Sequence, residues 1–497
     1  MDTSVNPEVP YKGNDRLLFG IIMGVVAFWL FAQTTLNISP DMSRDLGMDA
    51  SMMNVAVAIT SLFSGIFIVV MGGLADRVGR LRITRIGFYL SIAGSLLVAV
   101  TPQGQLAAPV VLLGRALQGL SAACIMPASL ALVKAFWDGP ERQRAISMWS
   151  IGSWGGSGLC SLVGGLMSQH FGWRSIFWLA VAVSVSGLWM MHGAPESKAE
   201  SKGKYRFDLS GVLAFMVTMV ALQVLVTQGN RLGWTSPTSL GLFAATVVFG
   251  WLFVRIESKA SSAFFDFSLF KNATYTGATI SNFLVNGTAG TLIVSLQLVQ
   301  IGGNMNAQQA GFLTLGYAIA IIAFIRVGEK LLQRFGPRKP MVWGCLITGL
   351  AILMVSPANL LLWDYKILAS VGYTLFGVGL AFYATPSTDA ALSNLPATQT
   401  GSGSGIYKMA SSLGAAFGVA ISAAIFTALS GDRASVSWLD GMITFAGRQD
   451  NLAVREAAIV ALGFNVLMVV MAIVSIMLTV PKGTKVQPSI SNLDAKP

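Results

Sequence analysis

The chain alternates long apolar stretches with short polar ones. Most apolar stretches reach the roughly 18–25 residues that a helix needs to cross about 30 Å of hydrocarbon. We expect a membrane helix over each of fourteen apolar runs, at residues 17–38, 52–74, 84–101, 108–133, 145–167, 174–193, 209–228, 238–256, 273–300, 309–328, 341–357, 366–387, 404–429 and 455–480. The pattern predicts an all-α polytopic membrane protein.

The runs group as six, two and six along the chain. Residues 331–338 are a degenerate repeat of residues 74–80, and each segment follows the second helix of a six-helix set. Such internal repeats are typical of transporters. We expect a six-helix bundle at 1–194, a linker with two inserted helices at 195–260, a second six-helix bundle at 261–482 and a cytoplasmic tail at 483–497.

Composition and charge support this interpretation. Of the 497 residues, 54% are hydrophobic and 11% charged, whereas water-soluble domains have about 25% charged residues. The net charge of +11 would suggest nucleic acid in a soluble protein, but the basic residues lie in short loops. About 25 of the 33 Lys and Arg fall on one side if the amino terminus is cytoplasmic, which predicts both termini in the cytoplasm and no nucleic-acid partner. The three cysteines and two histidines are too scattered for a metal site, and no cofactor is expected.

A charged turn follows the second run. Gly72 permits close helix contact, Gly79 suits a turn, and Asp76, Arg77 and Arg80 supply the charge. We expect these five residues to form a conformational latch. The alternative is an ordinary basic stop signal after a helix.

The glycine-rich segment at 401–405 is the expected partner of this latch. It lies at the predicted cytoplasmic start of the thirteenth helix, where free N–H groups and the positive helix end favour a carboxylate. We expect Asp76 to bind there, and the family resemblance of this turn, given below, implies that the contact stabilises an outward-open state.

The fourth run places Arg115 in an otherwise apolar helix, with Gln118 and Met126 on the same face. Such a charge costs at least ~2.5 kcal/mol at a helix centre, so it must face a cavity or a partner. A structural arginine that donates to carbonyls is the alternative. The fifth run carries small residues at four-residue spacing, which permit close packing: Gly152, Gly156, Cys160 and Gly164.

Several polar and aromatic side chains of the predicted helices are suited to line any cavity that the two bundles enclose. Aromatic, methionine and amide side chains give an adaptable surface for amphipathic ligands, and each of them taken alone also suits ordinary packing. Besides Arg115, the expected lining residues are Trp29, Gln33, Asn37, Gln118, Met126, Asn282, Asn286, Tyr373, Phe376 and Tyr383.

Several of these patterns resemble one family. The turn at 72–82 resembles the major facilitator signature, with Leu81 where a basic residue is common. Residues 115–119 resemble the R-x-x-q-G motif of the fourth helix in that family. The stripe ending at 164–165 resembles the antiporter motif of the fifth helix, although Cys160 and Ser161 replace its Gly-Pro, which weakens the antiport inference.

The first run resembles one branch of this family in particular. Thr34, Asn37 and Pro40 resemble the first-helix motif of the fourteen-helix drug:proton antiporters, although the membrane Asp of that motif is missing. The segments at 121–127, 149–156 and 405–410 are similar to those of quinolone exporters within this branch.

The resemblance implies a major facilitator fold in which two six-helix bundles surround a cavity and the two inserted helices lie at the periphery. It also implies proton-driven efflux of amphipathic drugs such as quinolones from the bacterial cytoplasm, with no enzymatic activity. The expected partners are drugs, protons and the lipid bilayer, and the expected state is a monomer. A transporter of a single metabolite and a non-transporting membrane sensor are the alternatives.

No acidic residue lies near the middle of any predicted helix, so the candidate proton carriers are Asp41 and Asp45 at the predicted outer mouth and Asp389 at the inner end of the twelfth helix. The family resemblance implicates Arg115 in coupling. Asp389 has the opposite charge of Lys408 close in sequence, which favours a structural pair between them. Asp41 follows Asn37 by one turn at the predicted outer mouth, and we expect it to carry the proton, with Arg115 as the charge that responds.

Overall fold

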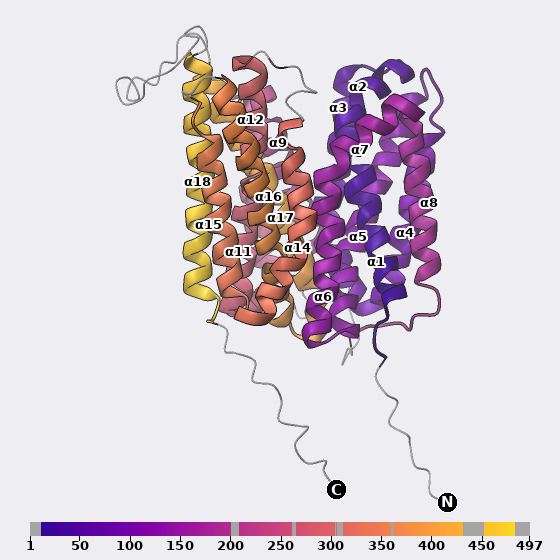
Figure 1. Ribbon diagram of the computed structural model, residues 1–497. Helices are drawn as coiled ribbons and strands as arrows, with labels where there is room; N and C mark the ends of the chain where they lie inside the picture. Colours follow the sequence, from indigo (N-terminus) through magenta and orange to yellow (C-terminus); the bar gives the residue numbers. More distant parts are fainter. Residues whose placement is uncertain are drawn as a thin grey trace, which may run out of the picture.

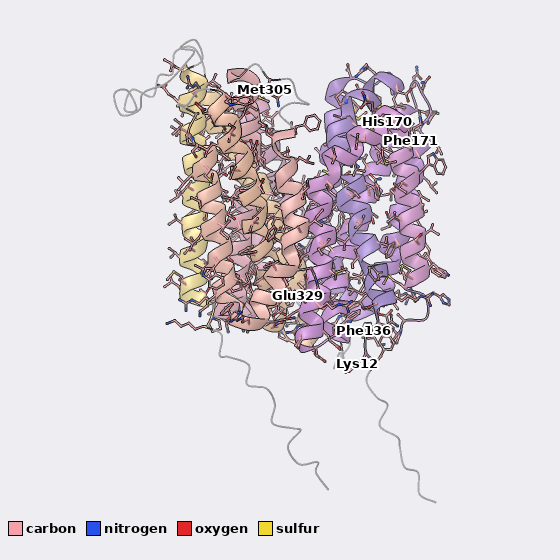
Figure 2. The ribbon with its side chains drawn as sticks, in the orientation of Figure 1. Lys12, Phe136, His170, Phe171, Met305 and Glu329 are labelled. Atoms are coloured by element: carbon pink, nitrogen blue, oxygen red, sulfur yellow. The ribbon has the colours of Figure 1, made fainter. Side chains whose placement is uncertain are left out.

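The computed structural model describes residues 11–199, 208–260, 265–303, 305, 312–358, 362–430 and 452–482, so the predicted tail at 483–497 lies outside the described residues. Two groups of helices stand side by side in Figure 1. The first and last described residues lie at the same end of the molecule, which we call the terminal end. The opposite end is called the distal end. Figure 2 shows Lys12, Phe136 and Glu329 at the terminal end and His170, Phe171 and Met305 toward the distal end.

The amino-terminal bundle contains the first eight α-helices and two π-helical segments. Its elements are α1 (Asp15–Val26), η1 (Ala27–Ala32), α2 (Thr35–Leu46), α3 (Ala50–Val78), α4 (Arg80–Ala99), α5 (Ala107–Phe136), α6 (Gly139–Ser150), η2 (Ile151–Gly155), α7 (Gly156–Phe171) and α8 (Arg174–Met190).

The prediction of one continuous helix over residues 17–38 is wrong, because the helix is interrupted and the chain remains helical beyond residue 38. The chain turns at Gln33 and Thr34 between η1 and α2, and α2 continues to Leu46, well beyond the predicted end at residue 38. The Thr34 hydroxyl donates to the Leu30 carbonyl and to the Cys160 carbonyl of α7. This side chain competes with the helical hydrogen bonds at the break, and Gly47 in the left-handed region ends α2.

The inserted helices are α9 (Leu209–Leu232) and α10 (Pro237–Glu257). They pack on each other, and α9 also contacts α3 and α17. The outward side of α10 exposes more than half of Leu240, Phe243 and Trp251. An apolar helix face without a protein neighbour suits lipid, as the expected peripheral position requires.

The carboxy-terminal bundle follows a short 3-10 segment. Its elements are η3 (Phe267–Lys271), α11 (Ala273–Gly287), α12 (Gly290–Gln297), the π-helical η4 (Leu298–Gly302), α14 (Leu315–Phe335), α15 (Arg338–Val355), α16 (Leu362–Ser393), η5 (Ala397–Gln399), α17 (Thr400–Leu429) and α18 (Leu452–Thr479).

Within the described residues, eleven helices are long and apolar enough to cross a membrane, or twelve if one sharply bent pair is counted as a single span. The total of fourteen is consistent with this result, because the helical stretches α6 to α7, α8 and α14 also match predicted runs. The all-α polytopic fold is confirmed.

Glycines allow α11, α12 and α17 to touch backbone to backbone. A Cβ on Gly414 would lie 2.0 Å from the Phe283 carbonyl oxygen, and one on Gly418 would lie 1.8 Å from the Gly287 carbonyl oxygen. Neither distance is possible for real atoms, so this contact exists only with glycine at both positions.

We expect Gly418→Ala to lower the melting temperature of the purified protein, because α17 must move away from α11 to admit the methyl group. Gly463→Ala is the matched control: it lies on α18, and a Cβ added there would have no atom within 4 Å, while alanine is favoured over glycine in a helix by up to ~1 kcal/mol. Thermal unfolding in detergent compares the two variants. Equal melting temperatures would contradict the proposed packing.

Candidate functional site

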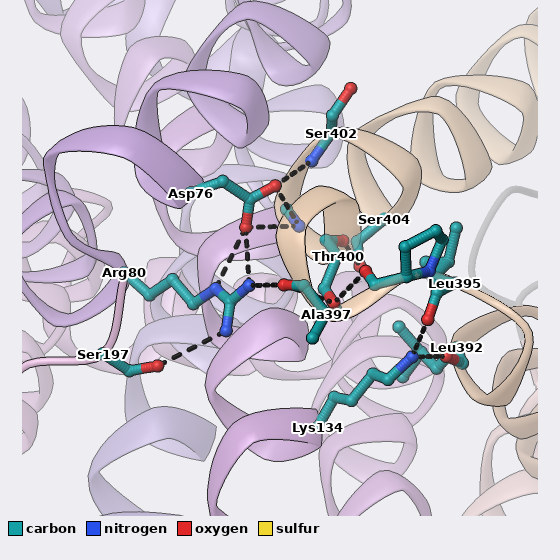
Figure 3. Close-up of polar contacts among 12 residues, drawn as sticks. Asp76, Arg80, Lys134, Ser197, Leu392, Leu395, Ala397, Thr400, Ser402 and Ser404 are labelled. Carbon is teal, nitrogen blue, oxygen red and sulfur yellow. Dashed lines mark hydrogen bonds and ion pairs between the residues drawn. The ribbon is translucent and has the colours of Figure 1, made fainter. Parts of the chain in front are cut away.

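The two bundles meet at the terminal end through a buried carboxylate. Asp76 on α3 accepts hydrogen bonds from the backbone N–H of Gly401, at 2.9 and 2.8 Å to its two oxygens, and from Ser402 at 3.1 Å (Figure 3). These N–H groups belong to the first turn of α17, where no helical carbonyl is available to them. The predicted contact between Asp76 and the start of this helix is confirmed.

Arg80 completes this contact from one turn further along the chain. Its Nε and Nη2 atoms donate to Asp76 Oδ1 at 3.0 and 2.8 Å, and Nη2 also donates to the Ala397 carbonyl at 2.6 Å. Asp76 and Arg80 are both at least 95% buried. A buried ion pair is tolerated only when its remaining donors and acceptors are also satisfied, and here both bundles supply those groups.

Gly72 and Gly79 are required for different structural reasons. A Cβ on Gly72 would lie 2.3 Å from the Gly401 carbonyl oxygen, so Gly72 permits the approach of α17. Gly79 has φ +133°, and a Cβ there would meet the Glu196 carboxylate at 2.5 Å. Glu196 accepts the backbone N–H of Leu81 at 2.8 Å and so caps α4. Arg77 lies on the same turn, partly buried, and its part in a latch stays a prediction.

Further polar contacts join the bundles at the same end. The Lys134 ammonium of α5 donates to the Leu392 carbonyl at 2.6 Å and to the Leu395 carbonyl at the end of α16. Arg142 of α6 forms an ion pair with Asp389 at 3.2 Å and donates to Ser393 Oγ at 2.8 Å. The sequence pattern identified these basic residues only as determinants of topology and did not predict this role.

The predicted pair between Asp389 and Lys408 is wrong. Asp389 lies about 6 Å from the end of α16 along the helix axis, whereas Lys408 lies about 12 Å into α17. The two side chains therefore face different levels of α6. Asp389 meets Arg142 near the start of α6, and the Lys408 ammonium lies over the Trp149 ring, 4.4 Å from its centroid.

Arg115 is almost completely buried, at 1% exposure. Its Nε donates to the Ala56 carbonyl at 3.1 Å, and its Nη1 donates to the Ala32 carbonyl and to Gln118 Oε1, both at 2.7 Å. Ala32 ends η1, so the guanidinium satisfies a carbonyl next to the break in the first helix. These contacts agree with the structural alternative, and a coupling role for Arg115 stays a prediction.

The small-residue stripe lies against the first helix. A Cβ on Gly152 would meet Ile22 at 3.3 Å, one on Gly156 would meet Trp29 at 3.1 Å, and one on Gly164 would meet Thr34 at 2.1 Å. The Cys160 carbonyl accepts the Thr34 hydroxyl at 3.1 Å. The stripe therefore has the close-packing function expected of it.

Of the expected cavity residues of the first bundle, Gln33 lies at the break between η1 and α2, whereas Met126 lies on α5, next to Ile125, which faces Gly24 of α1. Trp29 is partly buried, and its indole N–H has no hydrogen-bond partner among the described residues. Gln33 is also partly buried, whereas Met126 is buried. Asn37 lies on α2, and its side chain is outside the described part of the structure.

The expected cavity residues of the second bundle join hydrogen-bond networks inside that bundle. Asn282 Nδ2 donates to the Tyr407 carbonyl at 3.0 Å, and Asn286 Nδ2 donates to Asn282 Oδ1 at 2.9 Å. Tyr373 donates to Ser295 at 2.6 Å. The hydroxyl of Tyr383 lies 2.8 Å from that of Ser281. Phe376 is 2% exposed. Contact of these residues with a ligand stays a prediction.

Two carboxylates lie toward the distal end, on α2. Asp45 accepts from Trp173 Nε1 at 3.1 Å and pairs with Arg174 at 3.2 Å. Asp41 accepts from the Ser168 hydroxyl at 2.8 Å and pairs at 3.1 Å with Arg44, whose side chain is 80% exposed. The Asp41 side chain is itself 47% exposed, so water reaches it directly.

Comparison with known proteins agrees with this architecture. The family profile described as Major Facilitator Superfamily matches residues 17–285 and 275–492. The quinolone resistance protein NorB of Staphylococcus aureus strain MRSA252 is 43% identical over 477 residues, which cover 96% of this chain and 98% of the relative. NorB of strain MSSA476 is 44% identical over 479 residues, with the same coverage.

Solved structures show the same fold at much lower identity. The proton:xylose symporter XylE bound to 6-bromo-6-deoxy-D-glucose superposes with a TM-score of 0.62 at 15% identity, covering 94% of this chain and 96% of that one. An outward-facing bacterial homologue of the iron transporter ferroportin gives a TM-score of 0.60 at 10% identity, covering 93% and 98%. The family profile and the relatives both span nearly the whole chain. This protein therefore belongs to the major facilitator superfamily.

Proposed function

We propose that this protein exports amphipathic drugs, quinolones among them, across the bacterial cytoplasmic membrane by alternating access driven by proton antiport. The observation that carries the proposal is the contact of Asp76 with the first turn of α17, which closes the terminal end between the two bundles. The similarity to quinolone resistance proteins over 96% of the chain supports the substrate class.

The closing contact is suited to repeated opening. A carboxylate, backbone N–H groups and a guanidinium lose hydration when the bundles meet and regain it when they separate, so the net free-energy difference between the two states is small compared with either interaction alone. With both termini in the cytoplasm, the terminal end is the cytoplasmic face, and the conformation described here is closed to the cytoplasm. One chain supplies both sides of the closing contact, since Asp76 and the first turn of α17 belong to the same chain. The protein therefore acts as a monomer.

The pathway between the bundles requires a polar yet adaptable lining. The unpartnered indole N–H of Trp29 and the side chain of Gln33 lie at the break in the first helix, and we propose that they contact the drug. Alternating access would bring the amide and aromatic side chains of α11 and α16 to the same pathway.

The proton enters from the distal side in this proposal. One charge that crosses 100 mV supplies ~2.3 kcal/mol, so a group must titrate between the two faces. Asp45 pairs with Arg174, whose side chain is 33% exposed, whereas Asp41 pairs with Arg44, whose side chain is 80% exposed. Asp389 is part of the closing contacts. Asp41 is accessible to water at the distal end, and we retain it as the proton carrier, with Arg115 linking α5 to the break that precedes α2.

The function is tested with proteoliposomes that have an acidic interior. We expect a fluoroquinolone or a fluorescent amphipathic cation to accumulate inside, and a protonophore to abolish the accumulation. Saturable flux of one metabolite without drug flux would favour the single-substrate alternative. Absence of any flux would favour a sensor.

We expect Asp76→Asn to reduce drug transport at least tenfold at normal expression, because the amide loses the charge that binds Arg80 and the first turn of α17. The terminal end should then open, as measured by an increased distance between spin labels at positions 82 and 339, which are exposed on opposite bundles. Asp15→Asn is the control, since Asp15 forms an exposed pair with Arg144 within one bundle. An unchanged label distance and unchanged transport would refute the latch.

We expect Asp41→Asn to abolish uptake driven by a pH gradient while drug counterflow without a gradient continues, because only the proton step is lost. Asp389→Asn should reduce both activities in parallel, because it removes the partner of Arg142. Paired uptake and counterflow assays separate these patterns. If Asp41→Asn keeps full gradient-driven uptake, the proton is carried elsewhere.

A further inference from the structure

One buried cation differs from Arg80, Arg115 and Lys134. Lys408 on α17 is 7% exposed, and its ammonium lies 4.4 Å from the ring centroid of Trp149 on α6. Within the described part of the chain, the Lys408 ammonium has no hydrogen bond or ion pair. An ammonium has three N–H donors, and here they are offered only the face of an indole.

Arg80, Arg115 and the partly buried Lys134 each have oxygen acceptors for their charged groups. Arg80 pairs with Asp76, Arg115 donates to two carbonyls and an amide, and Lys134 donates to two carbonyls. A cation over an aromatic ring gains about 0.5–2 kcal/mol, which is less than the cost of removing an ammonium from water. The contact with Trp149 therefore compensates only part of the cost of burying the Lys408 ammonium in this state.

Trp149 is held in place to receive this cation. It is completely buried, and its indole N–H donates to the Ser129 hydroxyl of α5 at 2.9 Å. The ring edge is thus fixed to the amino-terminal bundle while its face meets a side chain from the carboxy-terminal bundle. The contact between Lys408 and Trp149 must break whenever the two bundles separate.

The position of Lys408 along α17 determines at which end of the molecule its ammonium becomes accessible when the bundles separate. The first two turns of α17 lie against α3, where a Cβ on Gly405 would be 2.8 Å from the Ile68 carbonyl oxygen. Lys408 lies one further turn from the terminal end, behind the contacts of Asp76. Opening at the terminal end therefore separates the Asp76 contact first and then exposes the Lys408 ammonium on the same side.

We propose that Lys408 binds the carboxylate of anionic or zwitterionic amphipathic substrates in the state open at the terminal end, and that Trp149 displaces this carboxylate when the terminal end closes. The inference rests on the proposed export function and adds to it the group that selects substrates with a carboxylate. It also gives a direction to transport, because the ammonium is available to the terminal side and is covered by an indole in the closed state.

The charge of Lys408 is what would distinguish one substrate from another. In the low-dielectric interface between the bundles, an ammonium and a carboxylate attract strongly. The substrate supplies the negative charge that Lys408 does not receive from the described protein groups. A substrate without a carboxylate gains nothing from Lys408. The residue should therefore affect discrimination between substrates more than the rate of export in general.

The test uses two probes that differ only in the carboxylate: a zwitterionic fluoroquinolone and the methyl ester of the same compound. Uptake of each is measured in acidic-interior proteoliposomes with the wild type, Lys408→Gln and Lys408→Arg. We expect Lys408→Gln to raise the KM for the acid at least tenfold and to leave the KM for the ester within twofold. Lys408→Arg should recover most of the preference, because it keeps the charge. Lys366→Gln is the matched control on the partly buried Lys366 of α16.

Equilibrium binding in detergent supplies an independent readout. Lys408→Gln should weaken binding of the acid at least tenfold, whereas Trp149→Leu should strengthen it severalfold by removing the competitor for the ammonium. Equal loss for acid and ester, or no change for either, would overturn the proposal. If the wild type transports neither compound, the proposed export function fails first, and the two failures are thereby distinguished.

Discussion

The structure depends on one buried carboxylate at the meeting point of two bundles. Asp76 is 3% exposed and can remain ionised there only because Arg80 and the first N–H groups of α17 surround it. This requirement determines its neighbours. Glycine is needed at 72 so that α17 can approach, and α17 must begin at the level of Asp76. The shape of the closed end follows from the solvation of a single charge.

The same constraint explains how polarity is distributed along the molecule. The polar contacts that Arg80, Lys134 and Arg142 make with the other bundle lie at the terminal end, and Figure 3 shows those of Arg80 and Lys134. Halfway along, the bundles touch through small and apolar residues, as where Gly155 meets Ile322. Apolar contacts allow the bundles to rock without leaving unsatisfied groups, whereas the polar contacts at the end set the energy of one closed state. A transporter needs both kinds of contact.

Arg115 and Lys408 show that buried cations in one protein can have different purposes. Arg115 donates to the carbonyls of Ala32 and Ala56 and so ties three helices of one bundle together. Its planar fork suits several fixed acceptors. The Lys408 ammonium contacts the π face of Trp149 in the other bundle and, within the described residues, has no hydrogen bond or ion pair. The first arrangement lies within one bundle, whereas the second crosses the interface between the two bundles.

Several features of this protein follow from local sequence pattern. Apolar runs of sufficient length predicted the all-helical membrane fold, because hydrocarbon demands that each crossing segment satisfy its own backbone. The residues at 72–80 and the glycines at 401–405 predicted the contact of Asp76 with α17, because an anion and a helix amino end attract each other in any context. The tertiary structure alone decided which cation Asp389 meets, what covers Lys408, that Glu196 caps α4, and where the first helix breaks. Those contacts depend on how each helix is rotated and how far it is shifted against neighbours remote in sequence, and neither quantity is encoded in the periodicity of a single run.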